Sequence, residues 1–122
     1  MPRRCRFPQV SLNNRPDPWA LDFLHFEGNA QTLRILAKLQ ILADNYGLNL
    51  TIGTLSAACK YTASATEINK ARHETSKLGY FASEYDLVAR VRETAGTGIA
   101  RNPITFIVEA ADDAVYNAVD PV

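Results

Sequence analysis

The sequence predicts an all-α fold of about four helices, and three observations lead to this prediction. Apolar residues recur at helical spacing between residues 35 and 46. Helix-capping residues, prolines and glycines stand where the apolar segments begin and end. No segment shows the alternating pattern of a convincing strand, and no internal repeat is present. The 122 residues suit one domain with a modest core.

The composition is typical of a soluble globular protein. Apolar residues make up 47% of the chain and charged residues 21%. Lysine plus arginine and aspartate plus glutamate both number 13, so no overall field favours nucleic acid or anionic lipid. No apolar run approaches the roughly 18 residues needed to span a bilayer. The two cysteines fit no metal or redox spacing, and we expect a cytoplasmic protein in a reducing compartment.

Residues 1–18 are predicted to form a Pro/Arg-rich extended or disordered arm ahead of a helical domain at 19–122. Four of the six prolines and four arginines fall in this arm. Because aromatic residues do not alternate with the arginines, a solvated tail is favoured and nucleic acid is an unlikely partner. An apolar segment at 19–26 follows the arm.

The first predicted helix runs from Glu27 to Tyr46, and Gly47 is placed to end it in a left-handed conformation. Its apolar positions follow the spacing of a buried stripe. These positions are Ile35, Leu36, Leu39, Leu42, Ala43 and Tyr46.

Two shorter helices are predicted next. Thr51 is a natural N-cap for a helix at 52–61. Ser83 is expected to cap a further helix that runs to about Glu93. The positions expected to face inward in it are Tyr85, Leu87, Val88 and Val91.

The last predicted helix begins near Pro103, where the missing N–H of proline is harmless. Asp112, Tyr116 and Asp120 stand at i, i+4 and i+8 and form one polar stripe. The adjoining positions are small or apolar, so this helix is expected to be packed nearly all round. From spacing alone, the stripe is either a solvated acidic patch or part of a site that meets a cation or hydrogen-bond donors.

The sequence does not contain a complete catalytic set. Its two histidines, His25 and His73, lie far apart, and a hydrolytic metal site usually needs three or more protein ligands. No serine or cysteine stands in a recognisable nucleophile setting with a histidine and an acid. We therefore assign no catalytic residue.

Several blocks of the sequence nevertheless resemble, in order and spacing, the bacterial deoxyguanosinetriphosphate triphosphohydrolases. This family belongs to the metal-dependent phosphohydrolase superfamily named for its His-Asp (HD) pair. The resemblance covers roughly residues 23 to 120. The blocks are His25-Phe-Glu-Gly-Asn-Ala-Gln-Thr-Leu-Arg-Ile-Leu36, Gly47-Leu-Asn-Leu-Thr51, Lys60-Tyr61, Lys77-Leu-Gly-Tyr80, Ser83-Glu84 and Glu109-Ala-Ala-Asp-Asp-Ala-Val-Tyr116.

The resemblance implies a role for each of seven residues. Asp112 looks like the last metal ligand of the family, and the metal would be Mg²⁺ or Mn²⁺. Tyr116 and Asp120 look like the residues that contact the deoxyribose. Asn29 resembles a nucleotide-contacting residue. The positions that match triphosphate-binding residues are Lys60, Tyr61 and Lys77.

The chain also departs from the family pattern. The first metal histidine, the His-Asp dipeptide and the catalytic His and Glu normally precede Phe-Glu-Gly-Asn, and residues 1–24 contain none of them. We therefore expect an internal fragment of a dGTP triphosphohydrolase that is inactive alone, with dGTP or another dNTP as the ligand. The resemblance also implies a homo-oligomer, as in the family. The alternative hypothesis is a non-catalytic helical module that binds a partner or assembles with intact subunits.

Overall fold

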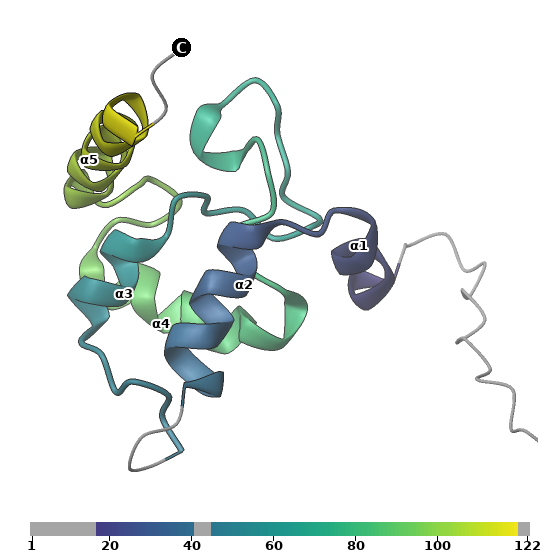
Figure 1. The fold of residues 1–122 in the computed structure, drawn as a ribbon. Coiled ribbons are helices and arrows are strands. Elements are labelled where there is room, and N and C mark those ends of the chain that lie inside the picture. Colours follow the sequence, from purple (N-terminus) through teal and green to yellow (C-terminus); the bar gives the residue numbers. More distant parts are fainter. Residues whose placement is uncertain (1–16, 41–44, 120–122) are drawn as a thin grey trace, which may run out of the picture.

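The computed structural model describes residues 17–40 and 45–119, and in this part of the chain the regular structure is helical (Figure 1). This confirms the all-α prediction, with five α-helices where about four were expected. Within the described residues, β-type backbone pairing is limited to an isolated bridge between Ala63 and Leu78. None of these helices has the length and apolar character needed to cross a bilayer. Most of the predicted arm, Leu42, Ala43 and Asp120 lie outside the described residues.

Helix α1 (Pro18–Leu24) occupies the apolar segment for which the sequence did not predict a helix. Asp17 is its N-cap, and the carboxylate accepts a hydrogen bond from the Trp19 amide at 3.1 Å. Pro18 takes the first helical position, where no amide donor is required. The Asp22 side chain then fixes the helix to the body of the chain, because it accepts from the Ala82 amide at 2.7 Å.

Helix α2 (Gly28–Arg34) continues into a π-helical turn, η1 (Ile35–Leu39), closed by a bond from the Gln40 amide to the Ile35 carbonyl at 3.0 Å. The prediction of one helix as far as Tyr46 is wrong, since Gln40 has left the helical conformation. The predicted buried stripe is also wrong in part. Ile35, Leu39 and Tyr46 are 41%, 58% and 70% exposed. The wider π turn rotates the residues after Arg34 relative to an α-helical register.

Gly47 has the predicted left-handed conformation, with φ of +64°, but it serves a loop rather than a helix end. A Cβ atom at this position would lie 2.4 Å from the Leu36 carbonyl oxygen. The next residue, Leu48, donates its amide to the same carbonyl at 2.9 Å. The chain can return this closely to η1 only because Gly47 has no side chain.

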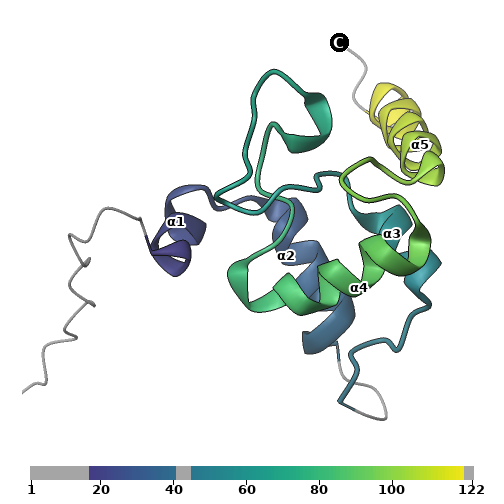
Figure 2. The same cartoon turned by 180° about the vertical axis from the view of Figure 1, so that it is seen from behind.

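The core lies where α2, α3 (Ile52–Ala58) and α4 (Tyr85–Ala95) meet, and Figure 2 shows α4 crossing the other two. Thr51 caps α3 as predicted, because its hydroxyl accepts from the Thr54 amide. Buried apolar side chains from all three helices fill the centre. The buried residues of this cluster are Leu33, Leu55, Tyr80, Val88 and Val91.

Two predictions about α4 are corrected. Ser83 does not cap α4, because it lies inside a 3-10 turn, η3 (Ala82–Glu84), and donates its hydroxyl to the Glu84 carboxylate at 2.6 Å. Tyr85 is 58% exposed rather than inward-facing. The carboxylate of Glu84 is fully buried. The Arg34 guanidinium lies 3.3 Å from it and the Lys38 ammonium 3.1 Å from it, so this buried charge is paired with two cations.

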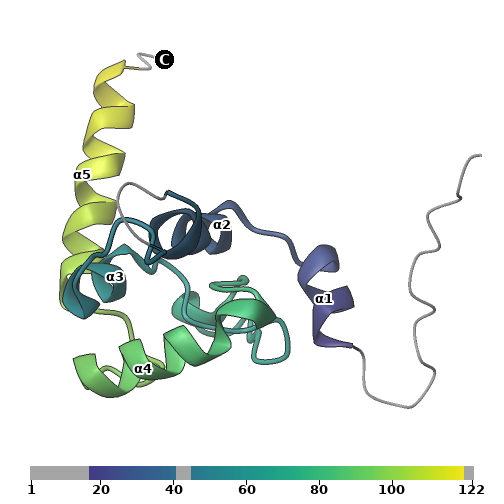
Figure 3. The ribbon, with the colours of Figure 1, turned by 90° about the horizontal axis from the view of Figure 1, so that it is seen from below.

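Helix α5 (Pro103–Val119) begins at Pro103 as predicted and then extends away from the rest of the chain (Figure 3). Its first turn is attached: the Thr105 hydroxyl donates to the Ala57 carbonyl at 2.8 Å, and Thr105 is buried. Beyond that turn nearly every described side chain is exposed. The prediction that this helix is packed nearly all round is therefore wrong, since nothing in the described chain covers it.

Candidate functional site

The loop between α3 and α4 brings Lys60, Tyr61 and Lys77 together. The Tyr61 ring is buried, at 6% exposure, and the Lys77 ammonium lies 5.6 Å from its centroid. Tyr61 is held there because the two sides of the loop are paired: Gly79 donates its amide to the Ala63 carbonyl at 2.8 Å. Gly79 also allows a close approach, since a Cβ atom on it would lie 2.1 Å from the Tyr61 carbonyl oxygen.

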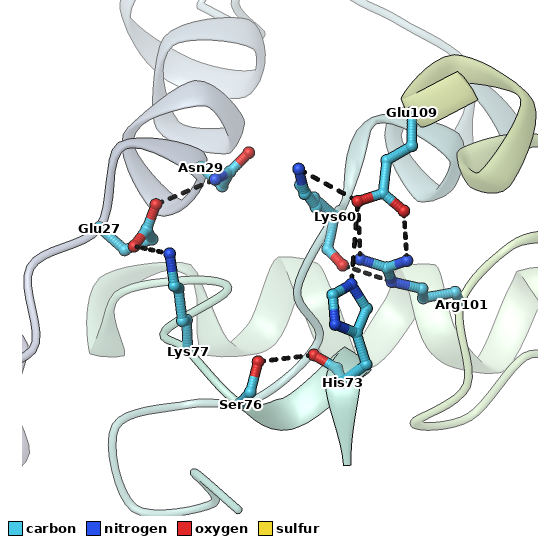
Figure 4. Close-up of polar contacts among 8 residues, drawn as sticks. All are labelled: Glu27, Asn29, Lys60, His73, Ser76, Lys77, Arg101 and Glu109. Carbon is cyan, nitrogen blue, oxygen red and sulfur yellow. Dashed lines mark hydrogen bonds and ion pairs between the residues drawn. The ribbon is translucent and has the colours of Figure 1, made fainter. Parts of the chain in front are cut away.

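Lys60 is positioned by α5. Its ammonium lies 3.0 Å from the Glu109 carboxylate, and this hydrogen bond raises the pKa of Lys60 (Figure 4). The Lys60 carbonyl in turn accepts from the Arg101 guanidinium at 2.7 Å. Lys60 therefore stays protonated at neutral pH and is tied to α5 through its side chain, while its backbone carbonyl is held by Arg101, which precedes α5.

Arg101 and Glu109 form the most buried ion pair beside this surface. The Arg101 side chain is only 3% exposed, and its guanidinium donates to Glu109 at 2.6 Å. The hydrogen bond from Arg101 lowers the pKa of Glu109, and the hydrogen bond from Lys60 lowers it further. His73, from the 3-10 turn η2 (His73–Thr75), places its imidazole 3.8 Å from the same carboxylate.

Lys77 has a matching acidic partner on the other side of the site, in the turn before α2. Its ammonium lies 3.6 Å from the Glu27 carboxylate, and Glu27 also accepts from the Asn29 side-chain amide at 3.0 Å. Figure 4 shows the Lys77–Glu27 pair and the Lys60–Glu109 pair flanking the same region. Asn29, Lys60 and Lys77 therefore flank one region, and the buried Tyr61 ring lies next to Lys77.

The predicted polar stripe of α5 is present for its two described members. Asp112 and Tyr116 line one hollow on the exposed part of the helix, together with Val115 and Val119. They follow Glu109 by about one and two helical turns on the same side of α5. Asp120 lies outside the described residues.

The described residues do not contain a group of three or more His, Cys, Asp or Glu side chains able to hold a metal ion. Asp112 alone does not fit a bound Mg²⁺ or Mn²⁺, since such ions take several oxygen ligands. The residues present can offer cations and hydrogen-bond donors to an anion, and a carboxylate and a phenol to a sugar or a shared metal.

Glu27, Arg101 and Glu109 were not assigned a role from the sequence. Glu27 and Glu109 stand inside the motifs that carry the family resemblance, which is the signal that could have drawn attention to them. Arg101 stands in no such motif, and its burial arises from the packing of α5 on the loop.

Comparison with known proteins finds relatives that are described as deoxyguanosinetriphosphate triphosphohydrolase-like proteins. The one from Listeria monocytogenes is 44% identical over 95 residues, which is 78% of this chain and 20% of the relative. The one from Synechocystis is 40% identical over 112 residues, covering 81% of this chain and 26% of the relative. The one from Pseudomonas aeruginosa is 33% identical over 115 residues, covering 89% and 26%. No protein-family model matches the sequence.

The chain thus spans between a fifth and about a quarter of the length of these relatives. The resemblance predicted from the sequence motifs is confirmed at this level: most of the chain is similar to one part of such proteins.

Proposed function

We propose that this chain, a homologue of one part of the deoxyguanosinetriphosphate triphosphohydrolase-like proteins, carries the substrate-binding side of a dNTP triphosphohydrolase site. The complete reaction would convert dGTP, or another dNTP, and water to the deoxynucleoside and tripolyphosphate. The observation that carries the proposal is that the fold brings Lys77 over the ring of Tyr61, the residue next to Lys60, so that both lysines flank one region (Figure 4).

Lys60 and Lys77 bind the triphosphate in this proposal. Both ammonium groups are partly exposed, at 36% and 55% of their side chains, so an anion can reach them. A lysine holds phosphate as a mobile point charge with three donors. The buried Tyr61 ring lies beneath the Lys77 ammonium and limits the directions that this side chain can take. Asn29 adds an amide donor and acceptor at the edge of the same surface.

The exposed face of α5 supplies the sugar side of the proposed site. Tyr116 and Asp120 would contact the deoxyribose, with the carboxylate accepting a hydrogen bond from the 3′-hydroxyl. Asp112 would be one ligand of a divalent metal whose other ligands are not found among the described residues. Because the described residues lack a metal-binding group, we propose that the chain alone does not hydrolyse dGTP.

Binding measurements on the full chain test the phosphate side of the proposal. Lys60→Met and Lys77→Met should each weaken tripolyphosphate and dGTP binding about tenfold, because each removes a charge-assisted hydrogen bond. Arg90→Met, which removes an exposed cation on α4, is the charge-matched control and should change little. Binding that is unaffected by both lysine variants would contradict the proposal.

Assaying tripolyphosphate release from dGTP with Mn²⁺ or Mg²⁺ tests the proposed inactivity. We expect no release above the rate without protein. Robust turnover that disappears in Asp112→Asn would show that the chain assembles a working site by itself.

A second candidate function, a module that assembles with intact subunits, is favoured by the surface of α5. Large apolar side chains on this helix are solvent-exposed, and contiguous apolar surface of this kind commonly marks an interaction site. Among the aliphatic side chains, Ile107, Val115 and Val119 are 68%, 62% and 76% exposed. Size-exclusion chromatography with light scattering, on the chain alone and mixed with a full-length relative, tests this function. A mixed complex that Val115→Asp abolishes supports it, and separate elution of the two proteins contradicts it.

A further inference from the structure

Each of the two lysines on the proposed phosphate surface already has a glutamate partner. The Lys60 ammonium lies 3.0 Å from Glu109, and the Lys77 ammonium lies 3.6 Å from Glu27. Neither glutamate belongs to the set of residues proposed to touch substrate. Both nevertheless stand where an incoming phosphate would have to compete for the ammonium group.

We propose that Glu27 and Glu109 determine which anions this surface accepts, by occupying the lysines until an oligophosphate displaces them. This inference rests on the proposed function, because it assumes that Lys60 and Lys77 bind phosphate groups. The two carboxylates hold each ammonium in position and lower the positive charge that a small anion would meet.

The charge of the cluster supports selection by ligand charge. Lys60, Lys77 and Arg101 bring three positive charges, and Glu27 and Glu109 bring two negative charges, so one net positive charge remains. A single phosphate that engages one lysine replaces one carboxylate contact and gains little. An oligophosphate can engage both lysines at once, and its larger charge repays the loss of both glutamate contacts.

The two glutamates differ in how firmly they are held. Glu109 receives the buried Arg101 guanidinium at 2.6 Å as well as Lys60, and it belongs to the regular helix α5. Glu27 belongs to the extended turn before α2, and its other contact is the Asn29 amide at 3.0 Å. Glu27 can therefore move aside when an anion binds, whereas Glu109 stays in place and Lys60 must turn from it.

Titration calorimetry of the full chain with orthophosphate, pyrophosphate and tripolyphosphate, at one ionic strength, tests the inference. The wild-type chain should prefer tripolyphosphate strongly. Glu27→Gln should tighten orthophosphate binding about two- to fivefold, the equivalent of one partly exposed ion pair. It should therefore reduce the preference for tripolyphosphate over orthophosphate. Glu109→Gln should act in the same direction. Glu93→Gln, an exposed position on α4, makes the same change in net charge and should leave the preference unchanged.

Two results would overturn the inference. The first is a ratio of the orthophosphate and tripolyphosphate dissociation constants that is the same in Glu27→Gln and Glu93→Gln. The second is weaker binding of all three anions in Glu27→Gln. If Glu109→Gln unfolds because Arg101 loses its partner, the comparison of Glu27→Gln with Glu93→Gln is the test of the inference. Lysine variants that bind tripolyphosphate as tightly as wild type would instead overturn the proposed function itself.

Discussion

Replacing Arg101 with alanine tests how α5 is attached to the rest of the chain. The guanidinium lies at the base of the helix, with only 3% of the side chain exposed. It donates to the Lys60 carbonyl at 2.7 Å and to Glu109 at 2.6 Å, so one side chain links the loop to the second turn of α5. Arg101→Ala removes both links and leaves the backbone of the helix unchanged.

The expected loss follows from these two contacts. Hydrogen bonds that involve a charged group contribute about 1.5–3 kcal/mol each. The Glu109 side chain is 25% exposed, so water replaces part of its lost contact, and the lower end of that range applies to both bonds. We therefore expect Arg101→Ala to lower the free energy of unfolding by about 3 kcal/mol.

Urea unfolding followed by circular dichroism measures this loss. Arg90→Ala is the matched control, because Arg90 is exposed on α4, and it should change stability by less than about 0.5 kcal/mol. Arg101→Lys retains the charge without the planar donor pair and should recover only part of the loss. Amide hydrogen exchange in α5 should also accelerate in Arg101→Ala. A loss equal to that of Arg90→Ala, with unchanged exchange in α5, would refute the reasoning.

Two further predictions concern acid stability and the loop that carries the site. Burial acts to raise the pKa of Glu84, but hydrogen bonds outweigh it and lower the pKa below its ordinary value of 4.5. The stabilisation from Glu84 should therefore be complete above about pH 4.5 and decline as the pH falls through the lowered pKa. In Glu84→Gln, the melting temperature should depend less on pH in this range. A pH dependence equal to that of the wild-type chain would contradict this prediction. Gly79→Ala should destabilise the chain by about 1–3 kcal/mol and abolish tripolyphosphate binding, because its Cβ would displace Tyr61. Gly28→Ala, where the added Cβ meets no atom within 4 Å, should bind normally, and equal binding by both variants would contradict the role given to the loop.

Local signals in the sequence predicted the features that depend on a few neighbouring residues. Thr51 caps α3 and Pro103 opens α5 as expected, because capping and the fixed φ of proline act within one turn. The helix predicted from Glu27 to Tyr46 failed for the opposite reason. Its apolar spacing suited a long helix, whereas the π turn at Ile35 and the return of the chain at Gly47 depend on packing between distant segments.

The candidate site shows the same division. The family resemblance pointed to Lys60, Tyr61 and Lys77, and the fold brings these residues to one surface. The glutamate partners of the lysines could not be predicted, because Lys60–Glu109 and Lys77–Glu27 join residues far apart in the chain. The exposure of α5 was also missed, since apolar spacing along a helix does not reveal whether anything in the same chain covers it.

The most direct test is a backbone amide NMR titration of the full chain with tripolyphosphate. We predict saturable shift changes that centre on Lys60, Tyr61 and Lys77, with smaller changes at Asn29 and the first turns of α5. Shift changes that centre elsewhere on the chain, or no saturable change at all, would contradict the assignment of this surface as a phosphate-binding site.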